Sequence, residues 1–339
     1  MTDARKAILE GKKEASRLHR RFSLRERIEE QGGRIDVFDT LVQSGVPLLF
    51  KPLDGLLGVF MDDPMPGILV TTKRPLSVQR FTGAHELGHF QFGHKPSLDD
   101  AEAILRRSPF NTQHAYAQQE MEADAFAIEF MLPPWLFAAH FKQQGWTAAM
   151  MSNPLIVYQL SLRVGASYEA TCRSLARPGV SVINRNILNS LLRVKRKDIK
   201  ASILQSYSPP DWWRDVWILT KRDEGSIIEG SRSDLFVLRL DEHSSAGYLW
   251  DFDQLNADGF AIVQDERETV DDEIIGSHVT RSITTQSEDR QSGVMCLSEK
   301  RPWQSDSIPL STLHFRYDLN GPEQEGWSQA ERRRLLEAA

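Results

Sequence analysis

The rhythm of hydrophobic and polar residues changes once along the chain, near residue 210. Before that point, apolar residues recur mostly at helical spacing, interrupted by short apolar runs that Gly, Asp and Pro bound. Beyond it, short apolar runs alternate with turn residues at intervals of roughly 10–20 residues, which is typical of an all-β sandwich. The pattern predicts an α+β chain, with a mainly helical domain followed by a β-sandwich.

The first half is expected to alternate helices with short strands. Strands are predicted at 45–53, 58–61 and 67–72, and a polar loop with a short helix at 95–115. Helices are predicted over 5–30, at the start of 34–50, from about Thr82, over 116–132 and over 157–176, the last divided by a glycine turn. The basic residues of 5–30 indicate the solvated face of an amphipathic surface helix, with nucleic-acid contact as the alternative.

A basic and proline-containing stretch over residues 193–211 separates the two patterns. We therefore expect four units: a first domain over 1–200, a linker over 201–214, a β-sandwich over 215–320 and a terminal helix over 321–339.

Composition narrows the class of protein. The chain has 339 residues, of which 40% are hydrophobic and 26% charged, so each half can build a core. A net charge of −6 argues against nonspecific nucleic-acid coating and against direct DNA reading, while leaving room for a local basic patch. Two distant cysteines exclude a disulfide scaffold or a cysteine-rich metal site. The N-terminus has no signal-peptide pattern and no apolar run reaches membrane-span length, so we expect a cytoplasmic protein without a membrane segment.

The segment His85-Glu86-Leu87-Gly88-His89 carries the most distinctive chemistry. Two histidines four residues apart lie on one face of a helix, where both can bind one zinc ion. Glu86 can reach a water molecule at such an ion and take its proton. Apolar neighbours place this helix partly in the core, where two histidines and a glutamate are costly to bury unless they are paired or bind a metal.

A third ligand must come from elsewhere, and the helix predicted over 116–132 offers it. Glu120 and Asp124 are four residues apart and share a face. We assign Glu120 to the metal and Asp124 to the second ring N–H of a ligand histidine. Glu122 points about 200° away from Glu120, so it is the less favoured alternative. His94 lies off the ligand face of a straight helix; it is expected to be structural, with a substrate contact as the alternative.

Three segments together resemble the ImmA/IrrE family of metallopeptidases over roughly residues 30–195. They are RFTGAHELGHFQFGH, EMEADAFAIEFMLPP and LSLRVGASYEATCRSLA. The resemblance implies a zincin-like core followed by a helix-turn-helix-like region, with His85, His89 and Glu120 as zinc ligands and Glu86 as catalytic base. Family members typically cleave a partner transcriptional repressor that carries its own helix-turn-helix, so the resemblance implies a regulatory endopeptidase acting in stress, mobile-element or toxin–antitoxin responses.

The second half resembles the chagasin-like inhibitors of papain-type cysteine proteases over roughly residues 230–320. That family is an immunoglobulin-like sandwich that uses loops at one end. The run before Gly247 reads HSSA, where the family usually has Asn-Pro-Thr-Thr, and the Gly-rich middle loop is reduced. The resemblance implies partner-binding loops that contain Ser245, Gly247, Tyr248, Trp250, Arg301, Pro302 and Trp303. The alternative is that Trp250 and Trp303 only pack the sandwich, with Arg301 stacked on one of them.

The leading hypothesis is a zinc-dependent regulatory endopeptidase with an appended β-sandwich. One alternative is a binding or sensor protein whose zinc core is structural. Another is a fusion in which the sandwich restrains this or another protease.

Overall fold

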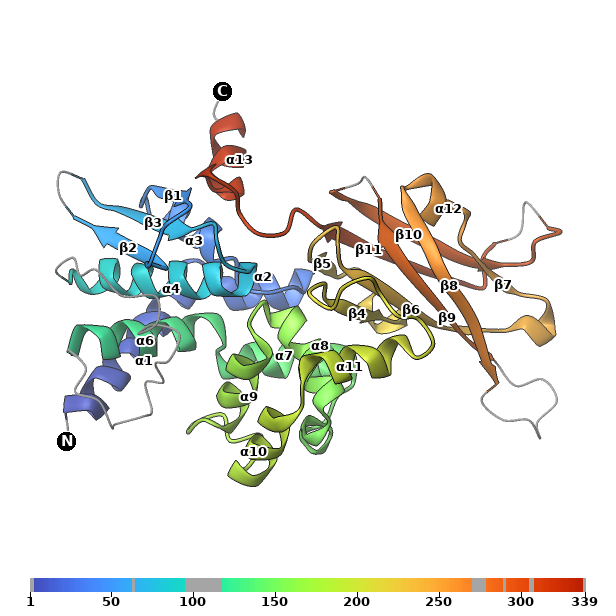
Figure 1. Ribbon diagram of the computed structural model, residues 1–339, viewed down its shortest axis with the longest axis horizontal. Coiled ribbons are helices and arrows are strands. Elements are labelled where there is room, and N and C mark those ends of the chain that lie inside the picture. Colours follow the sequence, from blue (N-terminus) through green and yellow to red (C-terminus); the bar gives the residue numbers. More distant parts are fainter. Residues whose placement is uncertain are drawn as a thin grey trace.

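Two main clusters of buried apolar side chains divide the molecule. The structure, a computed structural model, describes residues 3–62, 65–94, 118–269, 279–288, 291–304 and 308–337. Figure 1 shows an elongated shape, with helices and one small sheet at one end and a two-sheet sandwich at the other. The expected loop at 95–115 lies outside the described residues. No described helix combines the length and apolar character that a membrane span needs.

The helix expected over residues 5–30 is two helices, and the first of them belongs to the core. It breaks at Ser23, whose φ is 46°, between α1 (Asp3–Arg21) and α2 (Leu24–Gln31). α1 packs along α6 (Gln118–Met131), and a Cβ on Gly11 would lie 2.7 Å from the Glu122 carbonyl oxygen. Small residues on α1 therefore let the two helix backbones approach closely. The basic residues Arg5, Lys6, Lys13, Arg17, Arg20 and Arg21 are exposed, as expected for an amphipathic surface helix.

A four-stranded sheet lies above α4 (Leu76–Phe92), which begins six residues before the expected Thr82. The predicted strands at 45–53, 58–61 and 67–72 are confirmed as β1 (Leu48–Lys51), β2 (Gly58–Met61) and β3 (Gly67–Thr71), and α3 (Val37–Gln43) precedes them. The strand order is β12-β1-β3-β2, with β1 and β3 parallel. β2 is therefore an outer strand of this sheet.

The opposite outer strand, β12 (Gly326–Trp327), comes from the C-terminal tail. The tail leaves the sandwich, returns to the first domain and pairs β12 antiparallel with β1. The buried Gln79 amide on α4 donates to the Glu323 carbonyl (3.1 Å) and accepts from the Glu323 N–H (2.9 Å). The tail was expected to be a separate helix; it contains α13 (Gln329–Glu337), but it also completes the first domain's sheet and buries Ala330.

A helical layer joins the two parts. Its elements are α7 (Pro134–Gln144), η1 (Ala148–Ser152), α8 (Pro154–Val164), α9 (Tyr168–Ala176), α10 (Arg185–Arg193) and α11 (Arg196–Leu204). α8 and α9 form the expected helix–turn–helix around Gly165, whose φ is 71°. The expected linker at 201–214 begins inside α11, because Ile203 and Leu204 are buried and the Lys200 ammonium donates to the carbonyls of Trp212 and Arg214.

The second part is the expected sandwich of two four-stranded sheets. Their orders are β5-β11-β10-β7 and β4-β6-β9-β8. The elements are β4 (Val216–Leu219), η2 (Lys221–Asp223), β5 (Ile227–Glu229), β6 (Leu235–Glu242), η3 (Ser244–Ala246), β7 (Leu249–Asp251), α12 (Asp253–Ala257), β8 (Phe260–Thr269), β9 (Val279–Ser287), β10 (Ser292–Lys300) and β11 (Ser311–Asp318).

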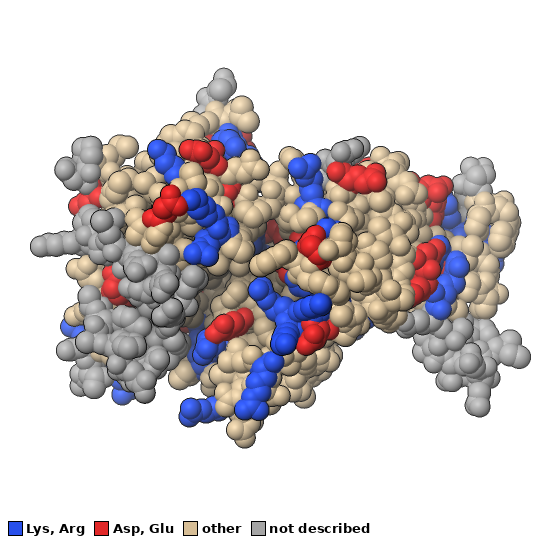
Figure 2. All heavy atoms as spheres, viewed as in Figure 1, with Lys and Arg blue, Asp and Glu red and all other residues tan. Residues whose placement is uncertain are grey.

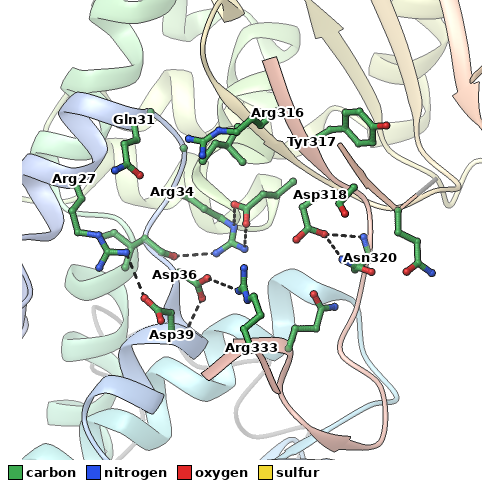
Figure 3. Close-up of a pocket in the computed structure, with 18 of the residues that line it drawn as sticks. Arg27, Gln31, Arg34, Asp36, Asp39, Arg316, Tyr317, Asp318, Asn320 and Arg333 are labelled. Carbon is green, nitrogen blue, oxygen red and sulfur yellow. Dashed lines mark hydrogen bonds and ion pairs between the residues drawn. The ribbon is translucent and has the colours of Figure 1, made fainter. Parts of the chain in front are cut away.

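Buried polar contacts hold the two parts together. The Tyr158 hydroxyl donates to Asp215 (2.8 Å), and the Arg163 guanidinium lies 2.9 Å from the Asp223 carboxylate. A cleft of about 970 Å³ separates α2 and α13 from β10 and β11. Arg34, labelled in Figure 3, and Glu229 both line this cleft and form an ion pair with an N–O distance of 2.7 Å. Charged groups are therefore paired inside the junction, where removal of one partner of a buried pair is strongly destabilising.

Candidate metal centre

α4 carries both histidines of the HELGH segment on its buried face. His85 and His89 are one helical turn apart, and their rings point at α6. A Cβ on Gly88 would lie 3.1 Å from the Ala123 Cα atom, so glycine at this position lets α4 and α6 approach closely. This approach brings Glu120, in the first turn of α6, to the two histidines.

Three ligand atoms converge on one point. His85 Nε2 lies 3.1 Å from His89 Nε2 and 3.3 Å from Glu120 Oε2, and His89 Nε2 lies 3.6 Å from the same oxygen. The three side chains are buried. Lone pairs that face one another away from solvent need a cation between them.

The triangle has the dimensions that a tetrahedral metal requires. Ligands at about 2.0–2.1 Å from a tetrahedral ion are about 3.3 Å apart. The three observed edges, 3.1, 3.3 and 3.6 Å, bracket that value. Two imidazoles and one carboxylate leave a fourth position for water or substrate, as in catalytic rather than closed structural sites. The donor set therefore fits a divalent metal ion.

Asp124 lies behind the first histidine. Its Oδ1 atom is 2.9 Å from His85 Nδ1, on the side of the ring away from the ligand triangle. A carboxylate there keeps the ring proton on Nδ1 and leaves the Nε2 lone pair for the metal.

His94 and Glu122 serve the second histidine in the same way, which the sequence did not indicate. His94 Nδ1 lies 3.1 Å from His89 Nδ1, and His94 Nε2 lies 3.0 Å from Glu122 Oε2. When His89 offers Nε2 to a metal, its Nδ1–H donates to His94, whose Nε2–H donates to Glu122. Burial lowers the pKa of His94, which favours the neutral ring that this chain of donors requires.

The reason for this arrangement is the end of α4. Gly93 ends the helix in a left-handed conformation with φ 60°, and the His94 N–H bonds back to the His89 carbonyl oxygen. The chain therefore turns over the last helical turn and places His94 beside His89. The expectation that His94 lies off the ligand face holds for a straight helix, but the turn gives it contact with a candidate ligand. Glu122 does not reach the triangle, yet it is part of the site through His94.

Glu86 lies between α4 and the outer strand β2. It is 4% exposed, and a Cβ on Gly58 would lie 3.1 Å from its Oε1 atom and 2.4 Å from the Thr82 methyl group. Gly58 therefore gives β2 its close approach to the helix. Glu86 follows His85 directly on α4, and its carboxylate lies against the edge strand β2.

The sandwich loops gather at the end farthest from α4, around β7 and the end of β10 (Figure 1). The Arg301 guanidinium lies 4.6 Å from the centre of the Tyr248 ring, so its stacking partner is a tyrosine instead of a tryptophan. Trp303 is 68% exposed and rests on Gly247, where a Cβ would lie 2.5 Å from the indole. Trp250 is buried in the sandwich core. Ser245 and Pro302 are exposed in the same two loops.

Residues 43–176 match the family model described as the IrrE N-terminal-like domain, peptidase M78. Residues 231–317 match the chagasin family of peptidase inhibitors, I42. The chain carries an IrrE-like domain and a chagasin-like domain. The metal triangle lies inside the first match, and the aromatic loops lie inside the second.

Solved structures give three further likenesses. A cysteine protease inhibitor, EhICP2, from Entamoeba histolytica is 22% identical, covering 32% of this chain and 99% of its own, with a TM-score of 0.28. Amebosin is 18% identical, covering 31% and 96%, with a TM-score of 0.26. A Mycobacterium tuberculosis transcriptional regulator is 16% identical, covering 53% and 54%, with a TM-score of 0.30. Comparison with curated proteins gives no match.

Proposed function

We propose that the chain is a zinc-dependent endopeptidase. The observation that carries this proposal is the buried triangle of His85, His89 and Glu120, with the buried Glu86 next to His85 on the same helix. A structural metal site needs no carboxylate base next to an open ligand position, whereas a hydrolytic site needs one. The IrrE-like match of this segment supports the same activity.

Zinc is the metal that fits this donor set and sequence pattern best. In zinc peptidases, two histidines and one glutamate are typical ligands, and the glutamate inside the HExxH segment is the base. When bound, the ion would polarise the scissile carbonyl and acidify water. Glu86 takes the proton of the attacking water and returns it to the leaving amine. Asp124 and His94 hold the two ligand rings in the required tautomers.

The edge strand β2 supplies a place for an extended peptide. β2 pairs with β3 on one side, and its other side faces outward among the described residues. A substrate strand added there gains main-chain hydrogen bonds and runs past Glu86. This geometry requires a substrate segment that can become extended, such as an interdomain linker. It favours selective cleavage of a protein over digestion of short peptides.

We further propose that the substrate is a partner protein such as a helix-turn-helix repressor. The support is the resemblance of the first domain to peptidases that act on such repressors. Cleavage would then change transcription in a stress, mobile-element or toxin–antitoxin response.

The test compares wild-type protein with Glu86→Gln in the source organism. Glutamine keeps the size of the side chain and cannot accept the water proton, so we expect one zinc per chain and at least a 100-fold loss of cleavage. Mass spectrometry of new protein N-termini in cells that express each form identifies substrates. We expect one or a few cleavage sites that depend on Glu86, one of them in a repressor.

One further variant and one further measurement control the experiment. His89→Ala should lose both the metal and the cleavage, whereas Glu86→Gln should lose the cleavage alone. This difference distinguishes the role of a ligand from that of a base. Metal content is measured for every variant. Equal cleavage by wild type and Glu86→Gln, with zinc present in both, would overturn the proposed mechanism; Glu86-dependent cleavage of other proteins would overturn only the repressor assignment.

The chagasin-like domain has a second candidate function, as a protein-binding module. The exposed Trp303 and the Arg301–Tyr248 stack form a rigid aromatic surface, which is the composition of interface hot spots. Papain supplied as a probe distinguishes an inhibitor from a recruiting module. Inhibition that Trp303→Ala weakens would identify a protease inhibitor. With papain activity unchanged, weaker cleavage of the cellular substrate by Trp303→Ala would identify recruitment.

A further inference from the structure

Charge is segregated in the helical layer between the two domains. Residues 170–197 contain seven Lys and Arg and no Asp or Glu, in a chain whose net charge is −6. Two of the seven serve the fold. Arg173 pairs with Glu169, and the buried Arg177 lies 3.0 Å from Glu129.

The remaining five cations are exposed, and within the described residues none of them forms an ion pair. They are Arg185, Arg193, Lys195, Arg196 and Lys197. Figure 2 shows Lys and Arg gathered over α10 and α11. Asp198, in the first turn of α11, is the acidic residue next to them in sequence, so the surface keeps an excess of positive charge. Like charges held together repel one another, and a polyanion that covers them lowers this repulsion.

α10 presents a single polar face. Its apolar residues point toward α9 and the core, while its exposed positions follow helical spacing. α10 also lies at the outer edge of the molecule in Figure 1, where a partner can approach it. The exposed positions are Arg185, Asn186, Asn189, Ser190 and Arg193. Arginine, asparagine and serine are side chains that contact phosphates and base edges.

The start of α11 extends the same surface. Lys195, Arg196 and Lys197 lie at its first turn, three cations beside the single acidic residue Asp198. The Lys197 ammonium lies 5.4 Å from the Trp212 ring centre, and the neighbouring Trp213 is 91% exposed. We define α10 together with Lys195–Lys197 as the basic face.

We propose that the basic face is a docking surface for duplex DNA. A nine-residue helix is about 13 Å long and fits lengthwise in the major groove, with the α11 cations on the flanking phosphates. Neutral hydrogen-bonding side chains between the cations favour DNA over an acidic protein surface. This local surface revises the expectation drawn from net charge, because a phosphate backbone responds to nearby charges within a Debye length of about 10 Å.

Docking on DNA is separate from the proposed peptidase activity. No residue of the basic face contributes to the metal triangle. If the peptidase proposal also holds, DNA binding would raise the local concentration of a DNA-bound substrate. That consequence rests on the proposed function, whereas the docking surface does not.

The test is fluorescence anisotropy with a labelled duplex of about 24 base pairs and the full-length protein. Titrations at about 50, 100 and 200 mM salt give the affinity and its salt dependence. We expect micromolar binding at the lowest salt and a log–log slope of about −4, from four or five phosphate contacts. The variant Arg193→Ala/Lys195→Ala/Lys197→Ala should bind at least 10-fold more weakly, and its slope should be less steep by about 3.

A matched control removes three exposed cations elsewhere. Lys51→Ala/Arg74→Ala/Arg316→Ala changes net charge equally but leaves the basic face intact, so it should bind DNA like wild type. Thermal melting and metal content establish that both triple variants are folded. Glu86→Gln should bind DNA normally, so failure of the peptidase proposal is distinguishable from failure of this one.

Three results would overturn the proposal. One is no DNA binding at the lowest salt. Another is equal weakening by the two triple variants, which would show a net-charge effect. The third is binding of poly-glutamate, but not DNA, in a manner that depends on the basic face; this would identify an acidic protein as its partner.

Discussion

The metal centre and the outer loops of the chagasin-like domain represent two ways to build a site. At the metal centre, ionisable side chains are packed away from water, and their arrangement is costly without a cation. At the loops, Trp303 is mostly exposed and the Arg301–Tyr248 stack is half-buried, so these side chains keep contact with water. The class of ligand can therefore be inferred from the buried polar groups of a single chain. An exposed aromatic surface indicates that a partner can bind, but not which one.

The two regions also lie at opposite ends of the elongated molecule (Figure 1). The loops extend beyond β7 and β10, whereas α4 lies near the opposite end, with the helical layer between them along the long axis. Within one chain, the loops are therefore placed to bind another protein and not to cover the chain's own metal centre. This arrangement favours recruitment over self-restraint among the functions considered for the sandwich.

Removing the tail tests whether the two regions are independent, and it has the largest expected effect. Truncation after Leu319 removes β12, the Gln79–Glu323 hydrogen bonds and the buried Ala330. We expect loss of metal binding and of the first domain's thermal transition, because β1 and the core beneath it become exposed. Truncation after Arg334 keeps these contacts and should behave like the full chain. A metal-loaded, normally melting 1–319 protein would contradict the role of the tail.

His140, a buried histidine outside the metal centre, tests the cost of burying an ionisable group without a metal. Burial, together with the nearby Arg163 guanidinium, lowers the pKa of His140 to about 4. In the unfolded chain this ring binds a proton near pH 6.5, whereas in the folded protein it does so only near pH 4. Folding stability therefore decreases as the pH is lowered from about 6.5 to about 4. The full loss is about 3 kcal/mol.

Thermal melting of wild type and His140→Gln between pH 4 and 8 measures the contribution of His140 to the pH dependence of stability. The variant should lose stability less steeply below pH 6.5, although it is less stable at pH 8. Parallel pH profiles of the two proteins would show that His140 does not supply the linkage.

The chain of contacts behind His89 gives the next prediction. His94→Ala should weaken zinc binding by about 10–100-fold, because His89 loses the acceptor that orients its ring. Competition with a fluorescent zinc chelator measures the affinity. Asp124→Ala is the matched variant on the His85 side, and Glu122→Ala combined with His94→Ala should cost little more than His94→Ala alone. Unchanged affinity in His94→Ala would make this histidine merely structural.

The smallest effect is expected at the outer loops. Arg301→Ala removes one stacking contact at a solvent-facing site, so it should cost about 0.5–1 kcal/mol. Zinc affinity should stay at the wild-type value, in contrast to His94→Ala. Calorimetric melting with zinc titration measures both quantities. A change in zinc affinity would show that the two regions are coupled through the junction.

Residue spacing allowed the prediction of those parts of the site that depend on one helix or one turn. His85 and His89 share a face because a helix has 3.6 residues per turn, and Glu120 and Asp124 share a face for the same reason. Five strands of the sandwich, β4, β6, β8, β10 and β11, were predictable from turn-bounded apolar runs, whereas the more polar β9 was not. The contact of His94 with His89 was not predictable, because the helix ends at Gly93 in a left-handed turn and helical spacing no longer applies to His94. Straight-helix geometry made Glu122 the less favoured alternative to Glu120, and the structure shows that it contacts the site through His94.

By itself, the sequence indicated the candidate metal donors, the proposed base and the division into a helical part and a sandwich, since these follow from local periodicity and side-chain chemistry. Only the tertiary structure decided that β12 completes the first domain's sheet, that α1 lies against α6, and that five cations share one exposed surface. The physical reason is that strand pairing, close helix packing and unscreened charge depend on which segments meet in space. Local patterns do not encode the partner of a two-residue strand more than 270 residues away from β1.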